Sequence, residues 1–164
     1  MTGTTTGTAK VTLPADDQIL ITRDFAAPRQ RVYRAWTTPD LVKRWWAGNR
    51  GTVTSVDIDL RVGGQWRYVM LANGDFEVAF HGEYREITPS ERLVHTEVYE
   101  TPGASDADAP VVTVTFAESG NRTTVTLLTE TRTKELRDAI LESGMEGGMQ
   151  ESMDALEQVA VSLD

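Results

Sequence analysis

Short segments of alternating apolar and polar residues occupy the middle of the chain, between residues 51 and 130. Turn signals such as Gly63-Gly64, Asn73-Gly74 and Ser119-Gly120-Asn121 separate these segments. Alternation with a period of two is typical of half-buried strands, and short turns join antiparallel neighbours. The pattern therefore predicts about six consecutive antiparallel strands, with a slip of the alternation at Ser55 that indicates a bulge.

Helical patterns flank this region on the N-terminal side. The segment Gln18–Phe25 has the β-branched, alternating character of a strand, and Pro28 follows at a position that suits the first turn of a helix. Thr38 or Asp40 can cap a second short helix that runs to about Trp46. We therefore expect one strand and two short helices before the long β region.

The last section, residues 133–162, carries apolar residues at spacings of three and four. Gly144, Gly147 and Gly148 weaken its first half. The sequence is equally consistent with a short helix followed by a long one and with a single bent helix.

This order of elements predicts one α+β domain over residues 18–164, preceded by a disordered tail over residues 1–17. The terminal helix and the two short helices are the only elements available to cover the sheet, so the sheet must curl around the long helix. An exposed edge strand, the first in particular, could mediate a homodimer.

Composition excludes several classes of function. The net charge of -9 opposes binding to a nucleic-acid backbone. The absence of cysteine excludes disulfides and thiolate metal sites and fits a reducing compartment, so we expect a cytoplasmic protein. No apolar run is long enough to span a membrane, and the opening residues do not resemble a signal peptide. We expect no metal and no cofactor.

Aromatic residues dominate the face of the sheet that should point inward. Glycine adds no volume to the covering helix and methionine adapts to irregular gaps, so room for a small apolar ligand could remain beside them. A dry core is the alternative. The candidate ligand-binding residues are Trp45, Trp46, Trp66, Tyr68, Phe80, Tyr84, His95, Glu97, Val114, Met145 and Met149.

The two histidines, His81 and His95, have no partner at metal-ligand spacing. His81 falls on the outward face, where we expect a solvated side chain. If Leu93 points inward, then His95, Glu97 and Tyr99 do too, and His95 with Glu97 would form an acid–base pair. The opposite register, which we favour, places Val94, Thr96 and Val98 inside.

Several segments, taken in order, resemble one known family. PRQRVYRAWTTPDLVKRWW (residues 28–46) resembles its helix pair, and DLRVGGQW (residues 59–66), Asn73-Gly74, residues 82–86 and 89–93, VTVTF and the Gly- and Met-rich last helix follow. The chain is thereby similar to the START-like (SRPBCC, helix-grip) superfamily, and within it to bacterial homologues of the heat-shock-protein-90 ATPase activator.

The resemblance implies a helix-grip fold, as in the birch-pollen-allergen type: a curved antiparallel sheet of about six or seven strands around a long C-terminal helix. It also implies an internal cavity for a small hydrophobic molecule such as a lipid, polyketide or aromatic metabolite. Many relatives carry Trp in place of Met149 and aromatic residues in the strand of His95 and Glu97, so no particular ligand carries over.

Three functions follow from these observations. The leading one is binding of a hydrophobic ligand in the cavity. The second is an enzyme, a cyclase, dehydratase or hydrolase, that uses His95, Glu97 or Tyr84 for proton transfer. The third is a co-chaperone that stimulates a chaperone ATPase, which the family name alone suggests.

Overall fold

A computed structural model describes residues 8–163 of the chain. Its helices are α1 (Arg29–Thr37), α2 (Pro39–Val42), the 3-10 turn η1 (Asp106–Asp108), α3 (Lys134–Glu142) and α4 (Met145–Ser162). Its strands are β1 (Lys10–Thr12), β2 (Gln18–Phe25), β3 (Gly51–Ile58), β4 (Gln65–Ala72), β5 (Phe76–Thr88), β6 (Arg92–Thr96), β7 (Val98–Tyr99), β8 (Val111–Ser119) and β9 (Arg122–Glu130).

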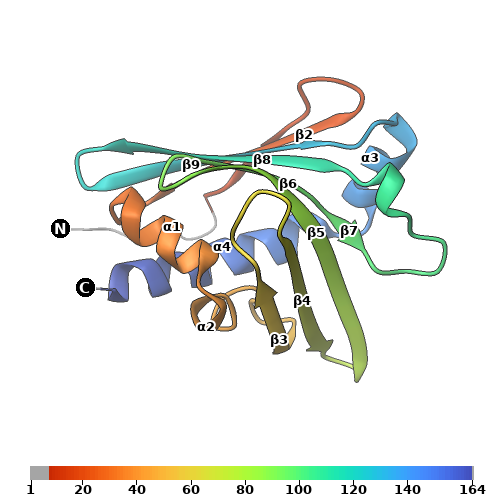
Figure 1. Ribbon diagram of the computed structural model, residues 1–164, viewed down its shortest axis with the longest axis horizontal. Coiled ribbons are helices and arrows are strands. Elements are labelled where there is room, and N and C mark those ends of the chain that lie inside the picture. The colour runs from red at the N-terminus through yellow and green to blue at the C-terminus, as the bar shows by residue number, and fades with distance from the viewer. Residues whose placement is uncertain (1–7, 164) are drawn as a thin grey trace.

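The strands form one antiparallel sheet in the order β1-β2-β9-β8-β6-β5-β4-β3, with β7 paired to β5 beside β6. Figure 1 shows this sheet bending over α4, which runs along its concave side together with α1 and α2. The predicted α+β helix-grip architecture is confirmed. The two strands beyond the predicted six or seven are short: β1 has three residues and β7 has two.

The expectation of a disordered tail up to residue 17 is wrong for Lys10–Thr12. This segment pairs with β2, and the side-chain amide of Gln150 binds both the N–H and the carbonyl of Ala9, at 3.2 and 2.7 Å. A three-residue strand is too short to show a period, and only its neighbours stabilise it. Residues 1–7, also assigned to the tail, lie outside the described residues.

Proline, glycine and the slip in the alternation predicted several boundaries of the helices and strands correctly. Pro28 precedes α1, the register of β3 against β4 shifts between Val53 and Ser55, and Gly74 turns between β4 and β5 with φ of 104°. The terminal helix breaks at Gly144, whose φ of 81° is in the left-handed region that favours glycine. The second helix is shorter than predicted, because turns replace it after Val42.

A buried ion pair connects the sheet to the long helix. Arg23 on β2 and Glu157 on α4 are each only 1% exposed. The Arg23 guanidinium donates to the Met153 carbonyl and to Asp154, both at 2.9 Å, and lies 3.4 Å from Glu157. Glu157 also accepts from the Ala26 N–H at 2.9 Å. These contacts position α4 along the concave face of the sheet.

Candidate functional site

A cavity of about 210 Å³ lies between the concave face of the sheet and α4. The segment from α1 through α2, strands β4, β5, β6, β8 and β9, and α4 all contribute to its wall. The lining residues are Trp36, Trp45, Trp46, Trp66, Tyr68, Tyr84, Leu93, His95, Glu97, Val112, Leu127, Met149, Ser152 and Met153.

Aromatic rings in mutual contact form much of this wall. The Trp46 and Trp66 rings lie 5.4 and 4.8 Å from the Tyr68 ring, and Trp36 lies 5.4 Å from Trp45. The Trp45 indole N–H donates to a carbonyl of α1 at 2.9 Å, which fixes its orientation. The rings are therefore held by one another and need no ligand to keep their places.

The absence of a side chain at Gly82 makes room for the Trp66 ring. Gly82 pairs with Trp66 across β4 and β5, and a Cβ atom at Gly82 would lie 2.5 Å from the Trp66 indole nitrogen and overlap the Thr96 carbonyl. That nitrogen is buried and has no hydrogen-bond partner among the described residues. Strands β4, β5 and β6 can approach so closely at this point because glycine has no side chain.

His95 enters the cavity as a neutral imidazole. Its Nδ1 donates to the Thr96 carbonyl at 2.9 Å, since a carbonyl can only accept, so Nε2 carries the lone pair. The ring packs edge-on against Trp66 at 5.3 Å and Tyr84 at 6.1 Å. Burial lowers the pKa of His95 to about 4, and the backbone hydrogen bond opposes this only in part. The site therefore presents an uncharged acceptor at neutral pH.

Glu97 follows β6, lines the cavity and is half-buried. Its backbone N–H donates to the Pro110 carbonyl at 3.0 Å. Within residues 8–163 its carboxyl group has no hydrogen-bond or ion-pair partner, and burial raises its pKa to about 7. The pKa of Tyr68 is also raised, first by burial and then by the charges of Tyr84 and Glu97, which places these groups close together.

The favoured register of the His95 strand is wrong. Leu93, His95 and Glu97 line the cavity, so Thr96 and Val98 lie on the opposite face. Thr96 and Val98 are nevertheless buried, and the Thr96 hydroxyl accepts from the Glu83 N–H at 2.9 Å. Both faces of this segment are covered, which explains why apolar character failed to identify the inner one.

Eight of the predicted site residues line the cavity: Trp45, Trp46, Trp66, Tyr68, Tyr84, His95, Glu97 and Met149. The other three lie elsewhere. Phe80 packs between Trp46 and Tyr99, Val114 is fully buried in the main core, and Met145 packs against a second cluster around Ile19 and Ile21.

The wall also contains residues that we had not assigned to the site: Trp36, Leu93, Val112, Leu127, Ser152 and Met153. Val112 lies on the buried side of the alternating strand β8, so alternation was the available signal for it. The alternation of β9 and the apolar face of α4 were the available signals for Leu127 and Met153. Ser152 gave none, because its hydroxyl donates to the Trp46 carbonyl at 2.7 Å across a long sequence separation.

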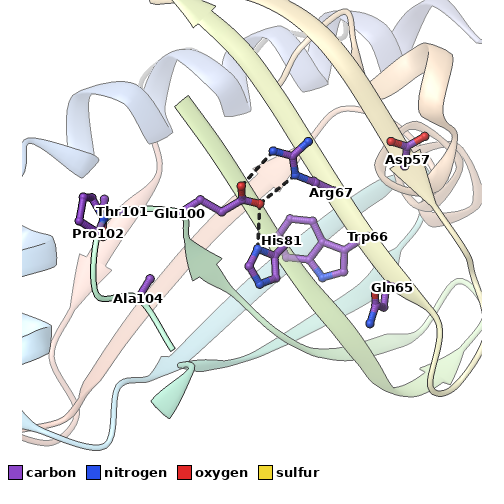
Figure 2. Close-up of a pocket in the computed structure, with 9 residues that line it drawn as sticks. All are labelled: Asp57, Gln65, Trp66, Arg67, His81, Glu100, Thr101, Pro102 and Ala104. Carbon is purple, nitrogen blue, oxygen red and sulfur yellow. Dashed lines mark hydrogen bonds and ion pairs between the residues drawn. The ribbon is translucent and has the colours of Figure 1, made fainter. Parts of the chain in front are cut away.

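A second hollow, an open cleft of about 670 Å³, lies beside β4, β5 and the loop after β7. Figure 2 shows Glu100 between Arg67 and His81 in this cleft. Arg67 donates two hydrogen bonds to Glu100, both at 2.9 Å, and the His81 ring lies 2.8 Å from Glu100 and 2.6 Å from Asp106. His81 lies on the outward face, as predicted, and its side chain is 33% exposed, but two carboxylates hold its ring.

The interior cavity is the better candidate for a functional site. In the outer cleft the charged side chains named above satisfy one another. The cavity instead holds the Glu97 carboxyl group and His95 Nε2, which residues 8–163 leave without a partner, in an apolar setting, the usual form of a small-molecule site. Residues 8–163 contain no cluster of three side chains suited to hold a metal ion. None of the helices in that range has both the length and the apolar character to cross a bilayer.

Comparison with known proteins gives the same fold. A family model described as "Activator of Hsp90 ATPase homolog 1-like protein" matches residues 26–160. A crystal structure of a protein from Rhodobacter sphaeroides is 24% identical, with a TM-score of 0.85 over 94% of this chain and 99% of that chain.

Two further structures have similar identities. A crystal structure from Mycobacterium smegmatis is 21% identical, with a TM-score of 0.82 over 93% of this chain and 97% of that one. The solution structure of an AHSA1-like protein from Aeromonas hydrophila is 23% identical, with a TM-score of 0.61 over 87% of this chain and 92% of that one. A search of curated proteins found no match. At identities this low, the structural similarity shows that the fold is shared and nothing beyond the fold.

Proposed function

The chain belongs to the family of Activator of Hsp90 ATPase homolog 1-like proteins, and we propose that it binds a small, largely apolar molecule in its interior cavity. The observation that carries this proposal is the cavity itself: an aromatic wall, held in place by its own contacts, around the Glu97 carboxyl group and the Nε2 atom of His95, neither of which has a hydrogen-bond partner in residues 8–163. Preformed apolar pockets with few polar groups are the usual form of small-molecule sites.

The volume of the cavity limits the size of the ligand. An engineered cavity of about 150 Å³ is known to hold benzene, so about 210 Å³ suits one substituted ring or a small fused pair. Among the hydrophobic molecules that the resemblance suggests, a compact aromatic metabolite fits better than a long lipid chain or a polyketide of several rings.

Catalysis in the same cavity is the second candidate function, and one observation favours it. A neutral imidazole with a free Nε2 and a carboxyl group with a pKa of about 7 share one apolar site. Groups whose environments move their pKa values in opposite directions are typical of acid–base pairs. For a bound compound that is converted, His95→Gln and Glu97→Gln should each abolish turnover while binding persists.

Thermal-shift and native mass spectrometry measurements with indole and naphthalene test the binding proposal. A compound that binds the folded state raises its melting temperature. Met149→Trp should fill the cavity and remove this increase, whereas Val161→Trp adds the same side chain on an exposed part of α4 and should leave the increase unchanged.

Two results would contradict the proposal. An equal increase in melting temperature in Met149→Trp would place the binding elsewhere on the molecule. The absence of any increase, together with no co-purified ligand mass, would mean that the cavity is a packing defect.

A further inference from the structure

The charges around the cavity are unbalanced. Of its fourteen lining residues, one is acidic, one is a histidine kept neutral, and none is lysine or arginine. The hydroxyl groups of Tyr68, Tyr84 and Ser152 are the other polar side-chain groups that line it, apart from the tryptophan indoles. A ligand with a carboxylate or phosphate would find no positive charge here and would face Glu97.

Two acceptors in the wall, on Glu97 and His95, are open to a ligand, beside the hydroxyl groups of Tyr68 and Tyr84, which can donate or accept. The Glu97 carboxylate has no hydrogen-bond donor in residues 8–163, and the lone pair of His95 Nε2 is likewise without a partner there. The Trp45 indole N–H is bonded to the backbone, and the Trp66 indole nitrogen is buried out of reach. A ligand that supplies several donors together with positive charge would satisfy both acceptors at once.

The rings around these acceptors suit a cation as well. Six tryptophan and tyrosine side chains line the cavity, and three of them form one contact cluster in which Trp46 and Trp66 both pack against Tyr68. The faces of such rings attract organic ammonium ions, and tryptophan does so most strongly. A desolvated carboxylate beside aromatic faces is an environment in which an ammonium group is stabilised from several sides.

We propose that the ligand of this cavity is a small aromatic amine whose protonated amino group binds Glu97 and His95 while its ring packs among the tryptophans and tyrosines. This inference rests on the proposed binding function and names the chemical class of the ligand. Burial of the carboxylate destabilises it in the empty cavity, and the ammonium group removes that penalty when it binds.

Three probes of nearly equal size and different charge test this selectivity: 2-phenylethylamine, 2-phenylethanol and 3-phenylpropionate. Calorimetric titration at pH 7 should rank the amine first and the carboxylate last. The amine should bind roughly tenfold more tightly than the alcohol, as expected for a hydrogen bond to a charged group.

Glu97→Gln separates charge from shape because the two side chains have the same size. This substitution should weaken amine binding by roughly tenfold and leave alcohol binding nearly unchanged. Glu77→Gln removes the same charge from an exposed position on β5 and should change neither affinity. The amine should also displace protons from Glu97, so its binding enthalpy should differ between phosphate and Tris buffers in the native protein and not in Glu97→Gln.

The failures of the two proposals are distinguishable. Equal affinities for amine and alcohol, unaffected by Glu97→Gln, would overturn the amine inference and leave the binding function standing. Tighter binding of the carboxylate probe would overturn it as well. If none of the three probes binds the native protein, the proposed binding function fails and the amine inference fails with it.

Discussion

Stability should depend on pH through Glu97 in a way that a single substitution reveals. The pKa of its carboxyl group is 4.5 in an unfolded chain and about 7 in the folded protein. The folded state therefore holds a proton between these values that the unfolded state has lost. Its stabilising effect is fully present below pH 4.5 and is lost as the pH rises through about 7.

The size of the effect follows from this interval. Each pH unit corresponds to about 1.4 kcal/mol, so the ionised Glu97 should cost the folded state about 3 kcal/mol above pH 7. His95 acts in the opposite direction. Its pKa falls from 6.5 to about 4, so its contribution is complete above pH 6.5 and is lost as the pH falls toward 4. Between pH 4.5 and 6.5 the two slopes nearly cancel.

Urea unfolding at pH 4.5, 6 and 8 measures the prediction. Glu97→Gln should equal the native protein in stability at the lowest pH and exceed it by about 3 kcal/mol at pH 8. The difference between the two proteins isolates Glu97, because every other titrating group is common to both. A difference that stays constant from pH 4.5 to pH 8 would refute the reasoning, since it would mean that the Glu97 carboxylate is not desolvated.

Two further predictions concern other parts of the molecule. Arg23→Met should destabilise the fold by about 3–5 kcal/mol in urea unfolding because it leaves Glu157 buried without the guanidinium. The double variant with Glu157→Met should regain much of that loss, and equal losses in both proteins would argue against a buried charge as the cause. The pKa of His81, followed by NMR titration, should lie above 6.5 because of its hydrogen bonds to Asp106 and Glu100, and Asp106→Asn should lower it. An unchanged value in that variant would show that the contact with Asp106 is absent in solution.

Local chemistry explains why so much of the fold is predictable. The turn at Asn73-Gly74 and the break at Gly144 each have glycine at a positive φ, and a slip in the alternation marks the bulge near Ser55. Strand β1, and the break at Glu97 that separates β7 from β6, were missed for the opposite reason. Strands β1 and β7 are three and two residues long, and their pairing partners, which lie on β2 and β5, determine them more than their own residues do.

The site was harder to predict because it depends on the direction in which each side chain points and on contacts between residues far apart in the sequence. Alternation places Arg23 on the same face of β2 as Ile21 and Phe25, which an ordinary surface arginine would not occupy. Its bond to the Met153 carbonyl helps to set the position of α4 and thereby which helix residues reach the cavity. This contact joins residues 130 positions apart, so no local pattern contains it.

The polar groups of the cavity favour the interpretation as a binding site over that as a packing defect. A defect left by imperfect packing would be apolar, because an apolar void stays empty at modest cost, whereas each buried polar group without a partner costs additional free energy. Here the wall combines an imidazole and a carboxyl group, and burial disfavours the charged form of both, which lowers the pKa of His95 and raises the pKa of Glu97. Local choices that work against stability are expected at functional sites. If a bound amine neutralises Glu97, its presence should remove most of the difference in stability between the native protein and Glu97→Gln in urea unfolding at pH 8. Persistence of the full difference in saturating 2-phenylethylamine would show that the amine does not reach the carboxylate.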